Sequence, residues 1–163
     1  MESTETLVPK VYEALRQRAA HLLGRGGGSL SPQSLVHDVL VKLYRAETQS
    51  WRDERHFRAV AAIAMRQLLV DRARRKATAR HGASPDLVSL TNVAVEGSPL
   101  DVVALTTALD QLEAARPRAA EVLMLRLFGG LSHEEIAEET GCSLSTVKRE
   151  WRLGQAWLQK QLT

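Results

Sequence analysis

Short polar and basic side chains gather on one face of a helix that the sequence predicts from residue 144 onward. Ser143 is a suitable N-cap for that helix, and Val147 marks its apolar face. Such side chains near the start of a helix suit the major groove of DNA, where they bind base edges and phosphates. The residues predicted to bind DNA are Ser145, Thr146, Lys148, Arg149 and Arg152. The alternative is an ordinary helical hairpin with a solvated polar face.

The residues before this helix predict a helix-turn-helix that positions it. Ser132 and Glu135 form an S-x-x-E capping box, which starts the first helix. Gly141 permits the positive φ that the turn requires. Ala137 is the small residue expected where the helices touch, and Val147 is the aliphatic residue that locks the second helix onto the first. These independent features favour DNA binding.

The charge of the chain is unevenly distributed. Of its 163 residues, 44% are apolar and 4% aromatic, so aliphatic residues and alanine must form the core. Residues 1–80 carry 15 Lys/Arg and 8 Asp/Glu, a net charge of +7, whereas residues 81–163 carry 7 and 11, a net charge of −4. A basic first half suits a polyanion such as nucleic acid, although a basic soluble surface is an equal alternative.

Several classes of protein find little support in the sequence. Cys142 is the single cysteine, which excludes an internal disulfide. No signal peptide or membrane span is found, so we expect a cytoplasmic protein without a membrane partner. His133 and Glu134 begin an H-E-x-x-H pattern, but position 137 is alanine. We therefore expect no catalytic residue, no metal and no cofactor, and we expect His133 to be a solvated first-turn residue.

Helical spacing of apolar residues predicts three helices in the first half, at about 8–22, 32–46 and 54–79. The third is strongly basic, since residues 52–80 hold nine basic and three acidic side chains. The second has a buried stripe made of Leu35, Val36, Val39, Leu40 and Leu43. The residues off this stripe are Gln33, His37, Asp38, Val41 and Lys42.

Residues 81–99 break the helical pattern with glycine, proline and small polar residues, which predicts a linker. Its apolar residues predict that part of it packs on a domain or a partner. Helical spacing returns from Leu100, and no strand pattern occurs outside the linker. The predicted fold is all-α, with two small helical domains (1–80 and 100–163) joined by the linker.

The chain resembles the bacterial sigma-70 family factors of the extracytoplasmic-function (ECF) type over nearly its whole length. The polymerase-binding helix of the family's region 2 is similar to LVHDVLVKLYRA (35–46). The promoter-binding segment that follows is similar to HFRAVAAIAMRQLLVDRARRKATARHG (56–82). Region 4, the most specific block, is similar to LMLRLFGGLSHEEIAEETGCSLSTVKREWRLGQAWL (123–158).

This resemblance implies an alternative sigma factor that binds core RNA polymerase, through the clamp helices of its largest subunit and its flap, and directs it to promoter DNA. The domain 1–80 would bind and open the −10 element, and the domain 100–163 would read the −35 element. The off-stripe residues of 32–46 would then bind the clamp helices. A flipped base needs a stacking partner, for which Trp51 and His56 are the candidates, whereas Phe57 is expected in the core. The residues expected to neutralise phosphates near the −10 element are Arg52, Arg55, Arg58, Arg66, Arg72, Arg74 and Arg75.

Two departures from the family pattern stand out. Many members place several acidic residues at the start of the polymerase-binding helix, where this chain has only Asp38. We hypothesise that phosphorylation of Ser31 or Ser34 by a Ser/Thr kinase supplies the missing charge; docking through other contacts is the alternative. Glu150 stands in the recognition helix where members often carry a basic residue, and it is expected to face a base amino group or to pair in solvent.

Two other functions compete with this interpretation. A helix-turn-helix regulator could bind operator DNA without acting as a sigma factor, but residues 35–80 lack the strand signals expected of a sensor domain. A protein-interaction module could retain a helix-turn-helix that no longer binds DNA. Regulation by an anti-sigma factor and the packing of the two domains, closed or open, are left undecided by the sequence.

Overall fold

The fold was analysed in a computed structural model, which describes residues 2–23, 31–45, 50–79, 87–88 and 100–162. These residues form seven helices and two short strand pairs, and the prediction of an all-α fold is confirmed. The helices are α1 (Thr4–Leu23), α2 (Pro32–Tyr44), α3 (Glu54–Ala79), α4 (Val102–Ala115), α5 (Pro117–Leu127), α6 (His133–Thr140) and α7 (Leu144–Leu162).

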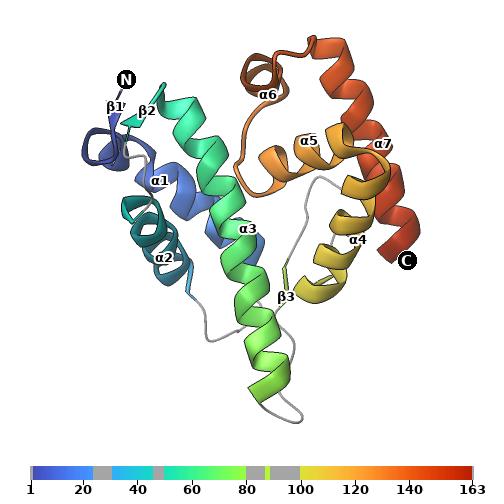
Figure 1. The fold of residues 1–163 in the computed structure, drawn as a ribbon, viewed down its shortest axis with the longest axis horizontal. Helices are drawn as coiled ribbons and strands as arrows, with labels where there is room; N and C mark the ends of the chain where they lie inside the picture. The colour runs from blue at the N-terminus through green and yellow to red at the C-terminus, as the bar shows by residue number, and fades with distance from the viewer. Residues whose placement is uncertain (1, 24–30, 46–49, 80–86, 89–99, 163) are drawn as a thin grey trace.

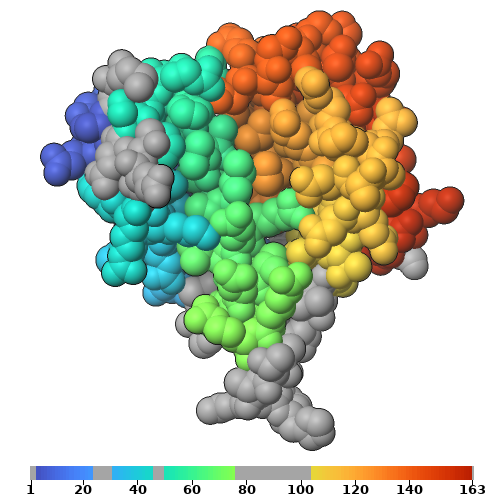
Figure 2. Space-filling view, in the orientation of Figure 1, coloured from blue at the N-terminus to red at the C-terminus, as the bar shows by residue number. Residues whose placement is uncertain are grey.

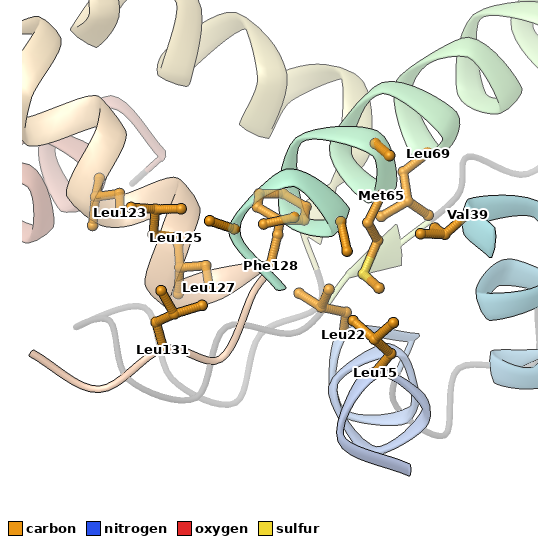
Figure 3. Packing of buried hydrophobic residues seen from close by; sticks show 14 of the residues in the cluster. Leu15, Leu22, Val39, Met65, Leu69, Leu123, Leu125, Leu127, Phe128 and Leu131 are labelled. Atoms are coloured by element: carbon orange, nitrogen blue, oxygen red, sulfur yellow. The ribbon is translucent and has the colours of Figure 1, made fainter. Parts of the chain in front are cut away.

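The long helix α3 lies in the middle of the molecule (Figure 1). It packs on α1 and α2 on one side, and on α4, α5 and α6 on the other. We call α1, α2 and α3 the first group and α4, α5, α6 and α7 the second group. Buried residues from both groups form one continuous hydrophobic cluster. In Figure 3, Leu15, Leu22 and Met65 come from the first group, and Phe128 and Leu131 from the second. The two groups are therefore closed upon each other, a choice that the sequence left open.

In the first group, α2 and α3 begin at residues that cap them, and the apolar residues of α2 recur at helical spacing. The stripe predicted for α2 is buried, from Leu35 to Leu43. Ser31 caps this helix by accepting a hydrogen bond from the Ser34 backbone N–H at 3.1 Å. Asp53 caps α3 by accepting one from the His56 backbone N–H at 2.8 Å, which lowers the pKa of the Asp53 carboxyl. The prediction that α2 reaches residue 46 was wrong, since it ends at Tyr44.

Two pairs of short antiparallel strands were not predicted. β1 (Glu2–Ser3) pairs with β2 (Ser50–Trp51), and β3 (Leu87–Val88) pairs with β4 (Leu100–Asp101). Each is two residues long, too short for a period-2 pattern to be seen. β3 lies against α1, so this part of the predicted linker packs on the first group. The rest of the linker lies outside the described residues.

Gly154 allows α7 to approach α5 closely. A Cβ atom at this position would lie 2.8 Å from both Cγ and Cδ1 of Leu123, which is fully buried. We expect Gly154→Val to lower the free energy of unfolding by about 1–3 kcal/mol through overpacking, measured by urea denaturation. Ala156→Val, at an exposed position of the same helix, controls for the helix propensity of valine. Combining Leu123→Ala with Gly154→Val should relieve part of the destabilisation. If it does not, the close approach of the two helices is not the cause of the destabilisation.

Candidate nucleic-acid interface

The structure confirms the capping box, the left-handed turn and the buried valine that the sequence predicts for the helix-turn-helix. The Ser132 side chain accepts a hydrogen bond from the Glu135 backbone N–H at 3.1 Å, and the Glu135 side chain accepts one from the Ser132 N–H at 3.0 Å. Gly141 ends α6 with a φ of 74°, in the left-handed region that favours glycine. Val147 is buried, and α7 packs against α6, α5 and α4.

The predicted DNA-binding face of α7 is open to solvent. Ser143 caps the helix, since its hydroxyl accepts a hydrogen bond from the Thr146 backbone N–H at 3.2 Å. The Ser143 hydroxyl also lies 2.9 Å from the Thr146 hydroxyl, which is half-buried. The other four predicted residues are exposed: Ser145, Lys148, Arg149 and Arg152. The first nine residues of α7, Leu144–Arg152, present hydroxyls and cations together, as major-groove binding requires.

The expectation for Glu150 was wrong. The residue is only 7% exposed and is buried within the protein rather than facing solvent or a groove. Its Oε1 atom lies 3.8 Å from Nη2 of Arg116 and 4.0 Å from Nη2 of Arg149, and its Oε2 atom is buried without a hydrogen-bond partner. A carboxylate needs partners when it is buried, so Glu150 acts within the protein and draws two cations toward the start of α7.

Sequence reasoning missed Arg116 and Arg118, which flank Pro117 at the start of α5. Both are exposed, and Arg118 contacts Cys142 in the turn of the helix-turn-helix. α5 begins without a side-chain cap. Cations are unfavourable at a helix N-terminus because of the macrodipole, so the stability of α5 itself does not explain two arginines at its uncapped start. Their contacts with Glu150 and Cys142 place both arginines beside the helix-turn-helix.

His133 is half-buried, so the expectation of a solvated residue was wrong. Its ring lies 5.7 Å from that of Trp151, and its Nε2 atom is buried without a partner. Burial lowers the pKa of His133, and the positive charge of Arg126 lowers it further. Arg126 also lies over the Trp151 ring, 5.5 Å from its centroid. His133 therefore belongs to the packing beneath α7.

Most of the arginines predicted to bind DNA near the −10 element are paired with the second group of helices. The Arg52 and Arg55 side chains bind glutamates of α6. Arg58 binds Glu135 at 2.8 Å, and Arg66 binds Asp110 of α4 at 2.7 Å. The remaining three lie further along α3, where Arg74 and Arg75 are exposed and Arg72 is half-buried.

The aromatic candidates for base stacking have different environments. Trp51 is 4% exposed, and its Nε1–H donates to the Thr4 hydroxyl at 3.0 Å. Its ring meets that of Phe57 edge-on at 5.2 Å, and Phe57 is in the core as expected. His56 is half-buried, with its Nδ1 atom accepting from the Arg52 backbone N–H at 3.3 Å. In this arrangement Trp51 is a core residue whose ring is not available to a base.

The residues predicted to bind polymerase share one face of α2. Gln33, His37, Asp38 and Lys42 are exposed, and Val41 is half-buried. Beside this face, a groove of about 720 Å³ runs between α2 and α3. The groove is largely apolar and includes Ile63, which is 41% exposed. Lys42 crosses its rim and donates a hydrogen bond to Gln67 Oε1 at 2.7 Å.

Within the described residues, no group of three or more His, Cys, Asp or Glu side chains is placed to hold a metal ion. None of the helices in that part of the chain is both long enough and apolar enough to span a membrane. Cys142, the free cysteine, is half-buried in the turn of the helix-turn-helix.

Comparison with known proteins places the chain in a family. No curated protein sequence matches it. Among solved structures, the sigma factor RpoE from Bartonella quintana, in complex with the anti-sigma factor NepR, is similar at 24% sequence identity and a TM-score of 0.43, with 97% of this chain and 95% of that chain covered. The model of the ECF sigma factor family matches residues 1–163. Because this match includes both groups of helices and the helix-turn-helix, the chain belongs to the ECF sigma factor family.

Proposed function

We propose that the exposed face of α7 reads the −35 element of the promoters that this ECF sigma factor serves. As a member of the family, the chain is an alternative sigma factor that binds core RNA polymerase and promoter DNA and directs transcription initiation. The observation that carries the proposal is the complete helix-turn-helix, which fixes Lys148, Arg149 and Arg152 on one open face. A regulator that acts without polymerase is not favoured by this membership.

Arg116 and Arg118 extend the proposed −35 surface. Both lie beside the start of α7, through the contacts of Arg116 with Glu150 and of Arg118 with Cys142. Their position at the edge of the helix-turn-helix suits contact with phosphates rather than with bases. Such contacts add affinity that is independent of sequence and sensitive to salt.

The first group of helices supplies the proposed −10 and polymerase surfaces. The basic residues of α3 would neutralise phosphates, and His56 would lie nearest to the opened strand. The exposed face of α2 and the apolar groove beside it would receive the clamp helices of the largest polymerase subunit, and the second group would contact the flap. The chain contributes binding rather than catalysis, and it would act in the cytoplasm, where polymerase meets DNA.

Run-off transcription with purified core polymerase tests the proposal. Templates drawn from the source genome should yield transcripts that depend on this protein. DNA binding without transcription or polymerase binding would instead support a regulator that binds operators.

We also propose phosphorylation of Ser31 or Ser34 as an activating modification. Both are exposed at the start of α2, a helix without an acidic residue in its first turn. A phosphate there would gain from the helix dipole and provide the negative charge that Asp38 alone supplies. A Ser/Thr kinase is the partner that this requires, and an anti-sigma factor is the alternative regulator.

Glutamate at both serines should mimic this charge. We expect Ser31→Glu with Ser34→Glu to tighten polymerase binding about 3- to 10-fold, in line with one or two added charge interactions, measured by fluorescence anisotropy. Ser31→Asn with Ser34→Gln keeps polarity without charge and serves as the control. Equal affinity of the two variants would show that docking relies on other contacts.

A further inference from the structure

Six charged residues join the two groups of helices in an ion-pair cluster between α6 and the start of α3, including Arg52 just before that helix. Arg52 Nη2 lies 2.7 Å from Glu139 Oε1, and Arg55 Nε lies 3.1 Å from Glu139 Oε2. Arg55 Nη1 lies 2.5 Å from Glu138 Oε2. The third arginine, Arg58, completes the α3–α6 cluster through its pair with Glu135. Every arginine in it is one that we propose binds DNA near the −10 element.

Glu139 is the centre of this cluster. Its side chain is only 9% exposed and pairs with both Arg52 and Arg55. Its hydrogen bond raises the pKa of the Arg55 guanidinium, which remains charged. The Arg55 side chain is 24% exposed and has both Glu138 and Glu139 as partners. These two arginines therefore meet carboxylates of their own chain where they would otherwise meet phosphates.

Contacts with backbone carbonyls hold the same seam closed. Arg58 donates from Nη2 to the Gly130 carbonyl at 3.0 Å, and Arg18 of α1 donates from Nε to the Leu127 carbonyl at 2.6 Å. A Cβ atom at Gly129 would lie 3.0 Å from that of Ala62 on α3. Figure 2 shows the start of α3 and the orange α5–α6 region meeting directly at the surface.

The closed arrangement affects the two proposed DNA surfaces differently. Carboxylates of α6 pair with the guanidinium groups of Arg52 and Arg55. While these ion pairs persist, the same N–H groups cannot bind phosphates. Lys148 and Arg149 remain exposed on α7, outside the seam. The closed protein thus presents the −35 surface and withholds the start of the −10 surface.

We infer that the α3–α6 cluster is a latch, in which Glu138 and Glu139 hold Arg52 and Arg55 away from promoter DNA until the two groups of helices separate. This inference rests on the proposed binding of these arginines to DNA near the −10 element, and it proposes how that binding is regulated. Phosphates replace the carboxylates one for one when the latch opens, so the charge on each arginine is never left without a partner. Partly exposed ion pairs are individually weak and screened by salt, so these carboxylates exchange readily for phosphates.

The test uses the full chain with Glu138→Gln and Glu139→Gln. Glu135 is kept, because it also caps α6. The matched control is Glu121→Gln with Glu134→Gln, which removes the same charge at exposed positions that have no described ion pair with α3. Fluorescent labels at Ala14→Cys on α1 and Lys160→Cys on α7, both exposed, report the separation of the two groups in a Cys142→Ser background.

Without DNA, energy transfer between the labels should show that the open fraction of the latch variant is at least about 5-fold that of the control. The same open fraction in both variants would overturn the inference, whatever the protein does on DNA. This readout is independent of the proposed function.

With promoter duplex, the plot of log affinity against log salt should be steeper for the latch variant than for the control by about 0.9 for each arginine released. Each variant lacks two carboxylates, so their net charges are equal. The difference in slope between them therefore reports the loss of the latch. If the latch variant opens but its salt slope equals that of the control, the latch does not control DNA binding and the inference is overturned. Loss of binding upon Lys148→Ala in the same assay would still support the separate proposal for α7.

Discussion

Replacing Lys148 and Arg149 together with alanine is expected to abolish transcription from promoters that depend on the −35 element. Both side chains are exposed on the open face of α7 and point away from buried Val147. A base-reading contact is worth about 1–3 kcal/mol, so removing two of them weakens promoter binding by at least about 30-fold. Run-off transcription with core polymerase measures the effect, and titration of labelled duplex gives the affinity.

A basic residue at the far end of the same helix provides the control. Lys160 is exposed in the last turn of α7, and Lys160→Ala should leave transcription nearly unchanged. Unchanged transcription by the Lys148 and Arg149 variant, with normal helix content, would contradict the proposed −35 surface. Arg116→Ala with Arg118→Ala should instead weaken binding equally for all sequences and reduce the salt slope by about 1 for each phosphate that the protein no longer neutralises.

Trp51→Ala is expected to destabilise the protein by about 3–5 kcal/mol, the range for truncating a large buried aromatic side chain. The ring is buried between the starts of α1 and α3, packs on Phe57 and donates to the Thr4 hydroxyl. For a chain of this size the destabilisation corresponds to a fall in Tm of about 6–20 °C. Thermal unfolding followed by circular dichroism measures it.

An exposed aromatic residue offers the matched truncation. Tyr12 on α1 is 37% exposed, so Tyr12→Ala should change Tm far less. Trp51→Phe keeps the ring packing and leaves the buried Thr4 hydroxyl without its partner, at a cost of about 1–3 kcal/mol. A Trp51→Ala variant with unchanged Tm that fails to open promoter DNA would restore the stacking role expected from sequence.

Local features of the helix-turn-helix could be predicted from the sequence because each depends on residues close together in the chain. The capping box of Ser132 and Glu135 and the left-handed turn at Gly141 are of this kind. The same holds for the exposed face of α2, where Asp38 and Lys42 follow from helical periodicity. The family resemblance then joined these local features into one function, which the family match confirms.

The burial of Trp51 and of Glu150 could not be predicted because each depends on residues remote in sequence. Thr4 meets Trp51 only after α1 and α3 pack together, so a ring suited to stacking becomes a core ring. Glu150 lies on a helix whose neighbouring polar residues face solvent, and only the packing of α5 against α7 buries it beside Arg116. Neither partner can be identified from helical spacing.

The sequence by itself determined the helices, their caps and the residues of α7 that face outward, since periodicity and capping act over a few residues. Only the tertiary structure decided that the two groups of helices close on each other. The arginines at the start of α3 and just before it are about 80 residues from the glutamates of α6, and each set alone suits a solvated surface. Their pairing needs the apolar seam around Phe128 and Leu131 to bring them together, and that seam exists only in the folded chain.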